Sequence, residues 1–314
     1  MSLLEDPLRG AGRAWTDAYL SAARLLTHVA TSALAMLWRP ALHWERSGAG
    51  PPVLLIMGLG LSGGAWWRTV PVLARDLEVI TFDNRGVGRS RALLHAYTTE
   101  AMADDARAVL DAAEVERAHV YGISLGGMVA QQLALRHPER VRSLVLGATH
   151  AGGAHTVRPD GDVIAFLRHR LAMRHEEGAW GSVPFNYSEP FRAEHPERIA
   201  EDIAQRLSQP FPLQAYRAQM WAGALHDCFD RLDRITAPTL VVHGREDRMI
   251  PVENGRLLAE RIPDATLIEL EGTGHLYPTE APQVDEEVAA FMLRHSRRPG
   301  AQDAAADEQI GELN

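Results

Sequence analysis

The sequence predicts an α/β protein in which helices cover both faces of a mostly parallel sheet, with a helical cap inserted into it. Short apolar runs alternate with helical stretches over residues 41–150 and again over 233–296, the pattern of parallel strands joined by crossover helices. Over residues 151–232 the strand-like runs disappear and helical patterns remain. A strand, a tight turn and a helix meet at the segment 122–126, GISLG. These observations predict one core with a cap over 151–232.

The composition limits the classes of function. The chain has 314 residues, 46% of them hydrophobic, which is enough for one large domain with an insertion. A net charge of −9 and the lack of a basic run argue against a nucleic-acid partner. There is no lysine, which excludes Schiff-base chemistry and a P-loop. The histidines show no metal-binding spacing, so we expect a small-molecule substrate and neither a metal nor a cofactor.

The two ends of the chain are expected to differ from its body. Residues 1–40 predict a helical extension without a signal peptide, and their apolar run over 25–38 is too short for stable membrane insertion. This helix would pack on the body, join two copies as a homodimer, anchor at an interface or cover the site. Residues 297–314 are polar and predict a disordered tail. The single cysteine, Cys228, fits a reducing compartment, so we expect a cytoplasmic protein.

The strands are predicted from apolar runs bounded by turn residues. Continuous runs such as 53–57 are typical of strands buried on both faces, and the glycine-rich loop 58–64 ends that run. The expected strands are residues 41–46, 53–57, 78–82, 119–123, 141–146, 239–243 and 266–270.

The helices are predicted from apolar positions at helical spacing and from their capping residues. Thr98 or Thr99 is a suitable cap for a helix that continues to Ala113, because a threonine hydroxyl can accept a first-turn N–H. The expected helices are residues 67–75, 99–113, 127–137, 161–174, 196–208, 213–227 and 282–294.

Ser124 is the candidate nucleophile. In the pattern G-x-S-x-G, the turn between strand and helix needs close neighbours without side chains, and Gly122 and Gly126 meet that need. The turn would hold the serine hydroxyl above the end of the sheet, beside a helix N-terminus that favours negative charge. The alternative is a tight turn with an inert serine.

A serine nucleophile needs a base, and the base needs a carboxylate to orient it. Glu246 and Asp247 follow the strand at 239–243, and His275 follows the strand at 266–270. Ligands of parallel sheets bind beyond the carboxyl ends of the strands, where all these residues are expected. Asp247 is the preferred acid, and Glu246 stays open as the alternative.

The residues around these positions resemble the α/β-hydrolase superfamily. Residues 241–247 (VVHGRED) are similar to its acid-loop block, and residues 83–90 (DNRGVGRS) to the block after its third strand. The resemblance covers nearly all of residues 41–296. Within the superfamily the chain is most similar to bacterial capped serine esterases, including the methyl esterases that act on polyketides.

The resemblance implies a role for each candidate residue. Ser124 would attack the carbonyl, His275 would transfer the proton, and Asp247 would orient His275. The backbone N–H groups of Leu59 and Leu125 would form the oxyanion hole. Met57 departs from the family, which commonly has histidine before the oxyanion loop. The side chains expected to line a bulky apolar substrate pocket, each of which could instead be core packing, are Trp66, Trp67, Trp180, Phe185, Met220 and Trp221. His150 follows a strand at the same edge and could also line the site, although a role at the hinge of the cap is preferred for it.

The function expected from these residues is hydrolysis of a carboxylic ester through an acyl-enzyme on Ser124. The same triad could instead cleave a thioester or a C–C bond, form a lactone or another ring, or carry out cofactor-free perhydrolysis, because the fold hosts many chemistries. A non-catalytic binding or scaffold protein that retains the pocket is the alternative of another class.

Overall fold

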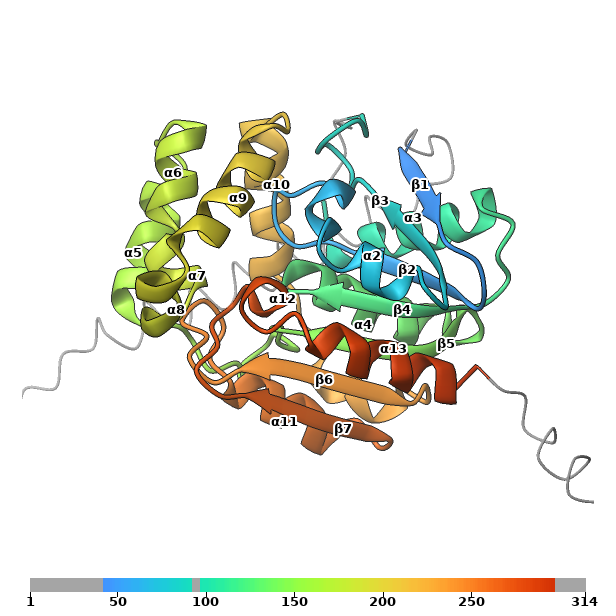
Figure 1. The fold of residues 1–314 in the computed structure, drawn as a ribbon. Coiled ribbons are helices and arrows are strands. Elements are labelled where there is room, and N and C mark those ends of the chain that lie inside the picture. The colour runs from blue at the N-terminus through green and yellow to red at the C-terminus, as the bar shows by residue number, and fades with distance from the viewer. Residues whose placement is uncertain (1–41, 92–96, 297–314) are drawn as a thin grey trace, which may run out of the picture.

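A computed structural model describes residues 42–91 and 97–296 (Figure 1). The predicted N-terminal helical extension and C-terminal tail lie outside the described residues. Within the described ranges no helix combines the length and the apolarity needed to cross a membrane.

The centre of the molecule is a seven-stranded sheet with the order β1-β3-β2-β4-β5-β6-β7. Only β1 runs antiparallel to its neighbour, β3, so the predicted mostly parallel α/β fold is confirmed. Each expected strand is present within a few residues. The strands are β1 (Trp44–Ser47), β2 (Pro52–Ile56), β3 (Glu78–Phe82), β4 (Ala118–Ile123), β5 (Val141–Gly147), β6 (Thr239–Gly244) and β7 (Ala265–Leu270).

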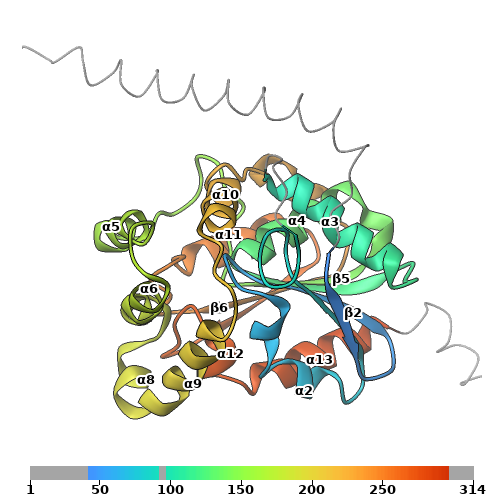
Figure 2. The same ribbon diagram turned by 90° about the horizontal axis from the view of Figure 1, so that it is seen from above.

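Helices cover both faces of this sheet (Figure 2). The sequence of β2 is apolar because both faces of the strand are buried. Leu54 packs in the cluster on one face of the sheet, and Leu55 packs in the cluster on the other. One face packs against α3 (Thr99–Ala112), α4 (Leu125–Arg136) and α11 (Glu253–Arg261), and the opposite face against α2 (Val70–Leu73) and α13 (Val284–Arg294).

Six helices between β5 and β6 lie together beyond the carboxyl ends of the strands, at the left of Figure 1. Some of them share a small apolar cluster that includes Tyr187, Ile199 and Ile203. We call them the α5–α10 segment: α5 (Gly161–His169), α6 (His175–Gly181), α7 (Val183–Asn186), α8 (Glu189–Glu194), α9 (Pro196–Leu207) and α10 (Leu213–Ala224).

Several helices differ from the sequence prediction. The helix expected at 67–75 is instead a 3-10 turn at Gly63–Trp66 followed by the short α2, in which Pro71 stands in the first turn, where its missing N–H costs nothing. The helix expected at 161–174 ends at His169. The prediction missed α6, α7, α8, α11 and α12 (Tyr277–Glu280), whose few buried apolar positions give a weak periodic pattern.

Asp285, in the first turn of α13, is fully buried, and this makes a testable prediction about stability. Burial raises its pKa to about 7, while the Thr69 hydroxyl lowers it and Glu286 raises it further. An acid whose pKa is raised in the folded state destabilises the fold when ionised, and the penalty disappears as the pH falls toward the unfolded pKa. We therefore expect Asp285→Asn to raise the free energy of unfolding by more than about 1 kcal/mol near pH 8, with no gain near pH 4.

Urea unfolding at both pH values measures this difference. Glu287→Gln is the control, because Glu287 is an exposed acid on the same helix turn. A variant Asp285→Asn that is less stable than the wild type at both pH values would show that the buried carboxylate stabilises the fold.

Candidate active site

Ser124 occupies the turn between β4 and α4 in a strained backbone conformation. Its φ of 56° and ψ of −122° lie in a region that residues other than glycine rarely adopt, at a cost of about 1–3 kcal/mol. Hydrogen bonds hold the strained residue on both sides. The Ser124 N–H donates to the Gly147 carbonyl at 2.8 Å, and the Thr149 hydroxyl donates to the Ser124 carbonyl at 2.8 Å. The turn therefore fixes where the Ser124 hydroxyl lies.

The two glycines of the G-x-S-x-G pattern are required by close backbone contacts. A Cβ at Gly122 would lie 2.2 Å from the Gly126 carbonyl oxygen, and a Cβ at Gly126 would lie 1.9 Å from the Ile56 carbonyl oxygen. Neither contact is physically possible, because backbone atoms cannot move away as a flexible side chain can. The first turn of α4 is thus packed directly on β4 and β2.

Asp247 and His275 lie together after β6 and β7. The His275 Nδ1 atom is 2.7 Å from Asp247 Oδ2. The other carboxylate oxygen of Asp247 accepts the N–H groups of Met249 and Ile250, at 2.9 and 2.8 Å. These bonds fix the carboxylate, so that it can orient the imidazole ring. The predicted alternative, Glu246, has an exposed side chain.

Asp247 is buried but remains ionised. Burial alone would raise its pKa, but the charge of His275 and the hydrogen bonds from His243 and His275 outweigh it and lower the pKa to about 2. His243 Nε2 lies 3.3 Å from Asp247 Oδ2 and also 2.8 Å from the Ile250 carbonyl oxygen. From its place at the end of a strand, the sequence favours a structural hydrogen bond for His243 over a catalytic role.

The loop after β2 lies directly beside Ser124. A Cβ at Gly58 would be 3.3 Å from Ser124 Cβ and 3.8 Å from Ser124 Oγ. The loop is held from below by Asn84, whose buried side-chain amide donates to the Met57 carbonyl at 2.9 Å. Met57 therefore does not leave the loop unsupported. Leu59 follows Gly58 on this loop, and Leu125 is the first residue of α4, where a backbone N–H has no carbonyl partner within the helix.

Gln219 connects the same loop to the α5–α10 segment. Its side-chain oxygen accepts the Gly60 N–H at 2.9 Å, and its side-chain nitrogen donates to the Arg85 carbonyl at 3.0 Å. The side chain is completely buried. The sequence analysis did not identify Gln219 or Asn84, because a lone amide in a helix or turn carries no pattern that marks it.

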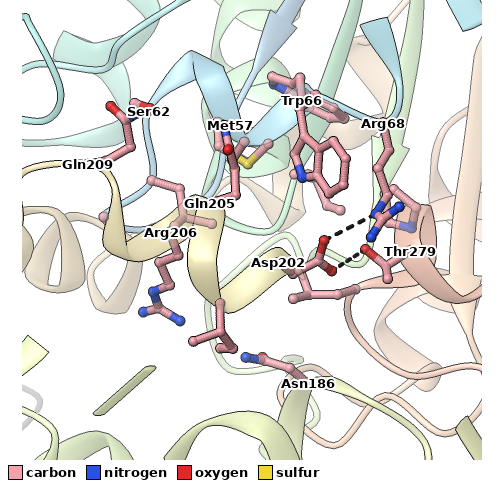
Figure 3. Close-up of a pocket in the computed structure, with 18 of the residues that line it drawn as sticks. Met57, Ser62, Trp66, Arg68, Asn186, Asp202, Gln205, Arg206, Gln209 and Thr279 are labelled. Carbon is pink, nitrogen blue, oxygen red and sulfur yellow. Dashed lines mark hydrogen bonds and ion pairs between the residues drawn. The ribbon is translucent and has the colours of Figure 1, made fainter. Parts of the chain in front are cut away.

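A cavity of about 90 Å³ lies between the loop after β2 and the α5–α10 segment (Figure 3). Ile123 and Leu276, the chain neighbours of Ser124 and His275, both line it. Of the predicted pocket residues, Trp66 and Trp67 line it as well. The cavity is therefore lined by the loop after β2 and by the residues next to Ser124 and His275 in the chain, while Ser124 and His275 themselves are not among its lining residues.

The other predicted pocket residues lie outside the lining of this cavity. The Trp180 and Trp221 side chains are 47% and 59% exposed, and Met220 is partly buried on the same helix as Trp221. The Phe185 ring packs on Phe166 with 4.9 Å between ring centres.

His150 belongs to a buried polar group beside α4. Its Nδ1 atom accepts the Gly152 N–H at 3.0 Å, and burial lowers its pKa to about 4. Its ring centre lies 6.3 Å from that of His226, which is buried and bonds to the Thr99 hydroxyl at 3.0 Å. These imidazoles have polar partners in the fold.

Among residues 42–91 and 97–296, no three or more His, Cys, Asp or Glu side chains are grouped so that they could hold a metal ion.

Comparison with known proteins gives the class of protein. The sequence pattern of the alpha/beta hydrolase fold family matches residues 51–282. The chain belongs to this family, and it is a hydrolase, as the resemblance predicted.

The more similar relatives include two bacterial proteins, both named "Putative carbamate hydrolase RutD". The protein from Variovorax paradoxus is 38% identical over 266 residues, which cover 81% of this chain and 97% of that protein. The one from Azorhizobium caulinodans is 35% identical over 255 residues, covering 79% and 92%. Among solved structures, a thermophilic esterase from Thermogutta terrifontis, with malate bound, has a TM-score of 0.70 at 29% identity and covers 82% of this chain and 94% of its own.

Proposed function

We propose that the chain is a serine hydrolase that cleaves a carboxylic ester of a small molecule through an acyl-enzyme on Ser124. The observation that carries the proposal is the strained Ser124 at the start of α4, combined with the 2.7 Å contact between His275 and Asp247 at the same edge of the sheet. Strain of this kind persists where the surrounding structure holds it, and it commonly marks a functional residue.

In the proposed reaction, the Ser124 oxygen attacks the ester carbonyl carbon while His275 takes the hydroxyl proton. His275 then gives that proton to the leaving alkoxide, and the acyl group remains on Ser124. A water molecule, deprotonated by His275, then attacks the acyl carbon. The bond from that carbon to the Ser124 oxygen breaks, and His275 returns the proton to this oxygen as the acid is released. Asp247 stays ionised throughout and stabilises the imidazolium, consistent with its low pKa.

The charge that develops on the carbonyl oxygen needs fixed donors. The N–H groups of Leu59 and Leu125 would supply them, because Gly58 brings the loop against Ser124 and α4 directs its N-terminus toward the same point. Removing one donor of this kind typically costs about 10²–10³ in turnover. Two hydrogen bonds would keep the loop in place: the Asn84 amide donates to the Met57 carbonyl, and the Gly60 N–H donates to the Gln219 side-chain oxygen.

The α5–α10 segment would act as the cap of this site. We propose the division predicted from the sequence, a core of residues 41–150 and 233–296 with a cap of residues 151–232. The buried Trp66 and the half-exposed Trp67 would contact the substrate beneath it, because both line the cavity. A covered site excludes water and strengthens the electrostatic interactions on which the reaction depends.

A carbamate is the second candidate for the bond that is cleaved. The observation that favours it is the shared name of the two relatives, at 38% and 35% identity over most of their length. A carbamate carbonyl is attacked in the same way as an ester carbonyl, so the two candidates need the same residues. Hydrolysis rates for matched nitrophenyl esters and carbamates would rank them.

The experiment that tests the serine mechanism is intact-mass measurement after treatment with a fluorophosphonate. We expect one adduct on the wild-type protein and none on Ser124→Ala, because only an activated serine reacts at speed. Ser208→Ala is a suitable control, since it removes an exposed serine hydroxyl at the end of α9 that makes no contact with Ser124. No adduct on the wild type, or an adduct that persists on Ser124→Ala, would refute the proposal.

A further inference from the structure

Arg170 and Arg206 of the α5–α10 segment have buried guanidinium nitrogens without a hydrogen-bond partner among the described residues. Arg170, at the end of α5, is 1% exposed, and none of its three guanidinium nitrogens has a hydrogen-bond partner among the described residues. Arg206, on α9, likewise has a buried Nε atom without a partner there, and its Nη1 atom reaches only the Ser182 hydroxyl, at 3.3 Å. Buried arginines are normally paired with carboxylates.

Aromatic rings surround the Arg170 guanidinium. Its central carbon lies 4.5 Å from the centre of the Phe211 ring and 5.5 Å from that of Tyr216. Such rings stabilise a cation over their faces, but the N–H donors of a guanidinium lie in its own plane and stay unused. A Cβ at Gly178 would be 2.2 Å from the same carbon, so a glycine is needed there to admit the group.

Arg170, Arg206 and His175 lie close enough to act on one another as like charges. Burial lowers the pKa of Arg206 and of His175, and the positive charge of Arg170 lowers both further. The carboxylate that acts on Arg170 is that of Glu177, whose side chain is exposed.

The acid of the cavity, Asp202, is already engaged. It stands one turn before Arg206 on α9, but its carboxylate bonds to Arg68 at 3.1 Å and to the hydroxyls of Tyr187 and Thr279. Figure 3 shows the Asp202 carboxylate turned toward Arg68 and Thr279, and the Arg206 guanidinium directed away from it. The cavity thus offers a positive charge that no acid of the described chain neutralises.

Arg206, His175 and Arg170 lie close to the loop beside Ser124. Arg206 and His175 line the same cavity as Met57 and Gly60 of the loop beside Ser124. Tyr216, which covers Arg170, packs against that loop, since a Cβ at Gly60 would lie 2.6 Å from the Tyr216 ring. One aromatic side chain therefore separates Arg170 from the loop.

We propose that Arg206 binds a carboxylate group carried by the substrate, on the portion that lies beneath the α5–α10 segment, and that the buried Arg170 behind it adds positive charge to this site. An unpaired buried charge destabilises a protein, and an arginine can bind a carboxylate with two parallel hydrogen bonds. A bound carboxylate would therefore supply the negatively charged acceptor that the described residues do not provide. This inference rests on the proposed function, because it names the class of ester that Ser124 would cleave.

The test compares two esters that differ in one charge. Nitrophenyl hydrogen glutarate carries a free carboxylate, and nitrophenyl methyl glutarate carries the same chain as a neutral ester. We expect the wild type to prefer the anionic ester. Arg206→Met should lower kcat/KM for the anionic ester by roughly 10- to 100-fold and leave the neutral ester unchanged, because it removes hydrogen bonds to a charged group. Arg170→Met should lower it less, because Arg170 does not line the cavity and acts through its charge. Arg168→Met, an exposed arginine on α5, should change neither ester.

Stability gives a second readout. Arg170→Met should keep or raise Tm, because it removes an unpaired buried charge, whereas a purely structural role predicts a lower Tm. Equal loss of activity on both esters, or a wild type without preference for the anionic one, would overturn the inference and leave the Ser124 mechanism standing.

Ligand binding separates this inference from the proposed mechanism. Glutarate should raise the Tm of the wild type and of Ser124→Ala, and should not raise that of Arg206→Met. If no fluorophosphonate adduct forms but this pattern holds, the anion site stands and the serine mechanism fails. An equal shift in Arg206→Met, no shift in the wild type, or a shift with inorganic phosphate alone would overturn the carboxylate site.

Discussion

Asp247→Asn is expected to lower kcat/KM by roughly 10⁴-fold, with little change in the fold. The asparagine side chain has nearly the same shape, but an amide cannot both accept from the Met249 and Ile250 N–H groups and receive the proton of His275 Nδ1 in the way the carboxylate does. Its amide nitrogen would favour the wrong tautomer of His275, and the imidazolium would lose its counter-charge. Steady-state hydrolysis of a nitrophenyl ester measures the effect.

Glu246→Gln provides the matched control. It makes the same chemical change at the adjacent residue, whose side chain is exposed, and it should leave the rate unchanged. The comparison also settles the alternative left open by the sequence. If Glu246→Gln caused the large loss and Asp247→Asn did not, the acid of the triad would be Glu246, and the 2.7 Å contact of His275 with Asp247 would have no catalytic meaning.

The elements that sequence reasoning predicted well are those whose pattern is local. The run over 53–57 is apolar because the strand is buried on both faces, and β3 was predicted at its observed bounds, Glu78–Phe82. Thr98 was one of two predicted caps of α3, and its side chain does accept the Ala101 N–H, at 3.1 Å. In each case the signal and the interaction that causes it lie within a few residues of each other.

The contacts that shape the candidate site are long-range, and no local pattern reveals them. The bond between Gly60 and Gln219 joins residues 159 positions apart, and the cavity lies between a core loop and helices inserted much later in the chain. The sequence analysis did not identify Arg170, because a charged residue within a helical pattern is normally exposed. Only the packing of α6 and of the Phe211 and Tyr216 rings around it turns it into a buried cation.

The strain and the unpaired charge are both costs that the rest of the fold must offset. Ser124 holds an unfavourable backbone conformation, and Arg170 is buried without an acceptor in the described structure. Sequence propensity alone favours neither arrangement, which explains why local rules fail at these positions. Variants that remove such features are expected to gain stability and lose function.

Gly126→Ala is expected to destabilise the protein by more than about 3 kcal/mol, although two opposing effects act there. Alanine is a better helix former than glycine by about 1 kcal/mol, so helix propensity alone would make the variant more stable. Against this, the new Cβ would lie 1.9 Å from the Ile56 carbonyl oxygen and 2.9 Å from that of Met57. Relief requires α4 to move away from β2, which would displace Ser124 from the loop at Gly58.

Gly161→Ala tests the same substitution where the space is open. Gly161 is the first residue of α5, and a Cβ there would meet nothing within 4 Å, so the variant should be as stable as the wild type or slightly more stable. Urea unfolding of both variants measures the difference. A Gly126→Ala protein as stable as Gly161→Ala would mean that α4 is not packed on β2 as tightly as the carbonyl contact requires. Rigid placement of Ser124, on which the proposed mechanism depends, could then no longer explain the reactivity of this serine.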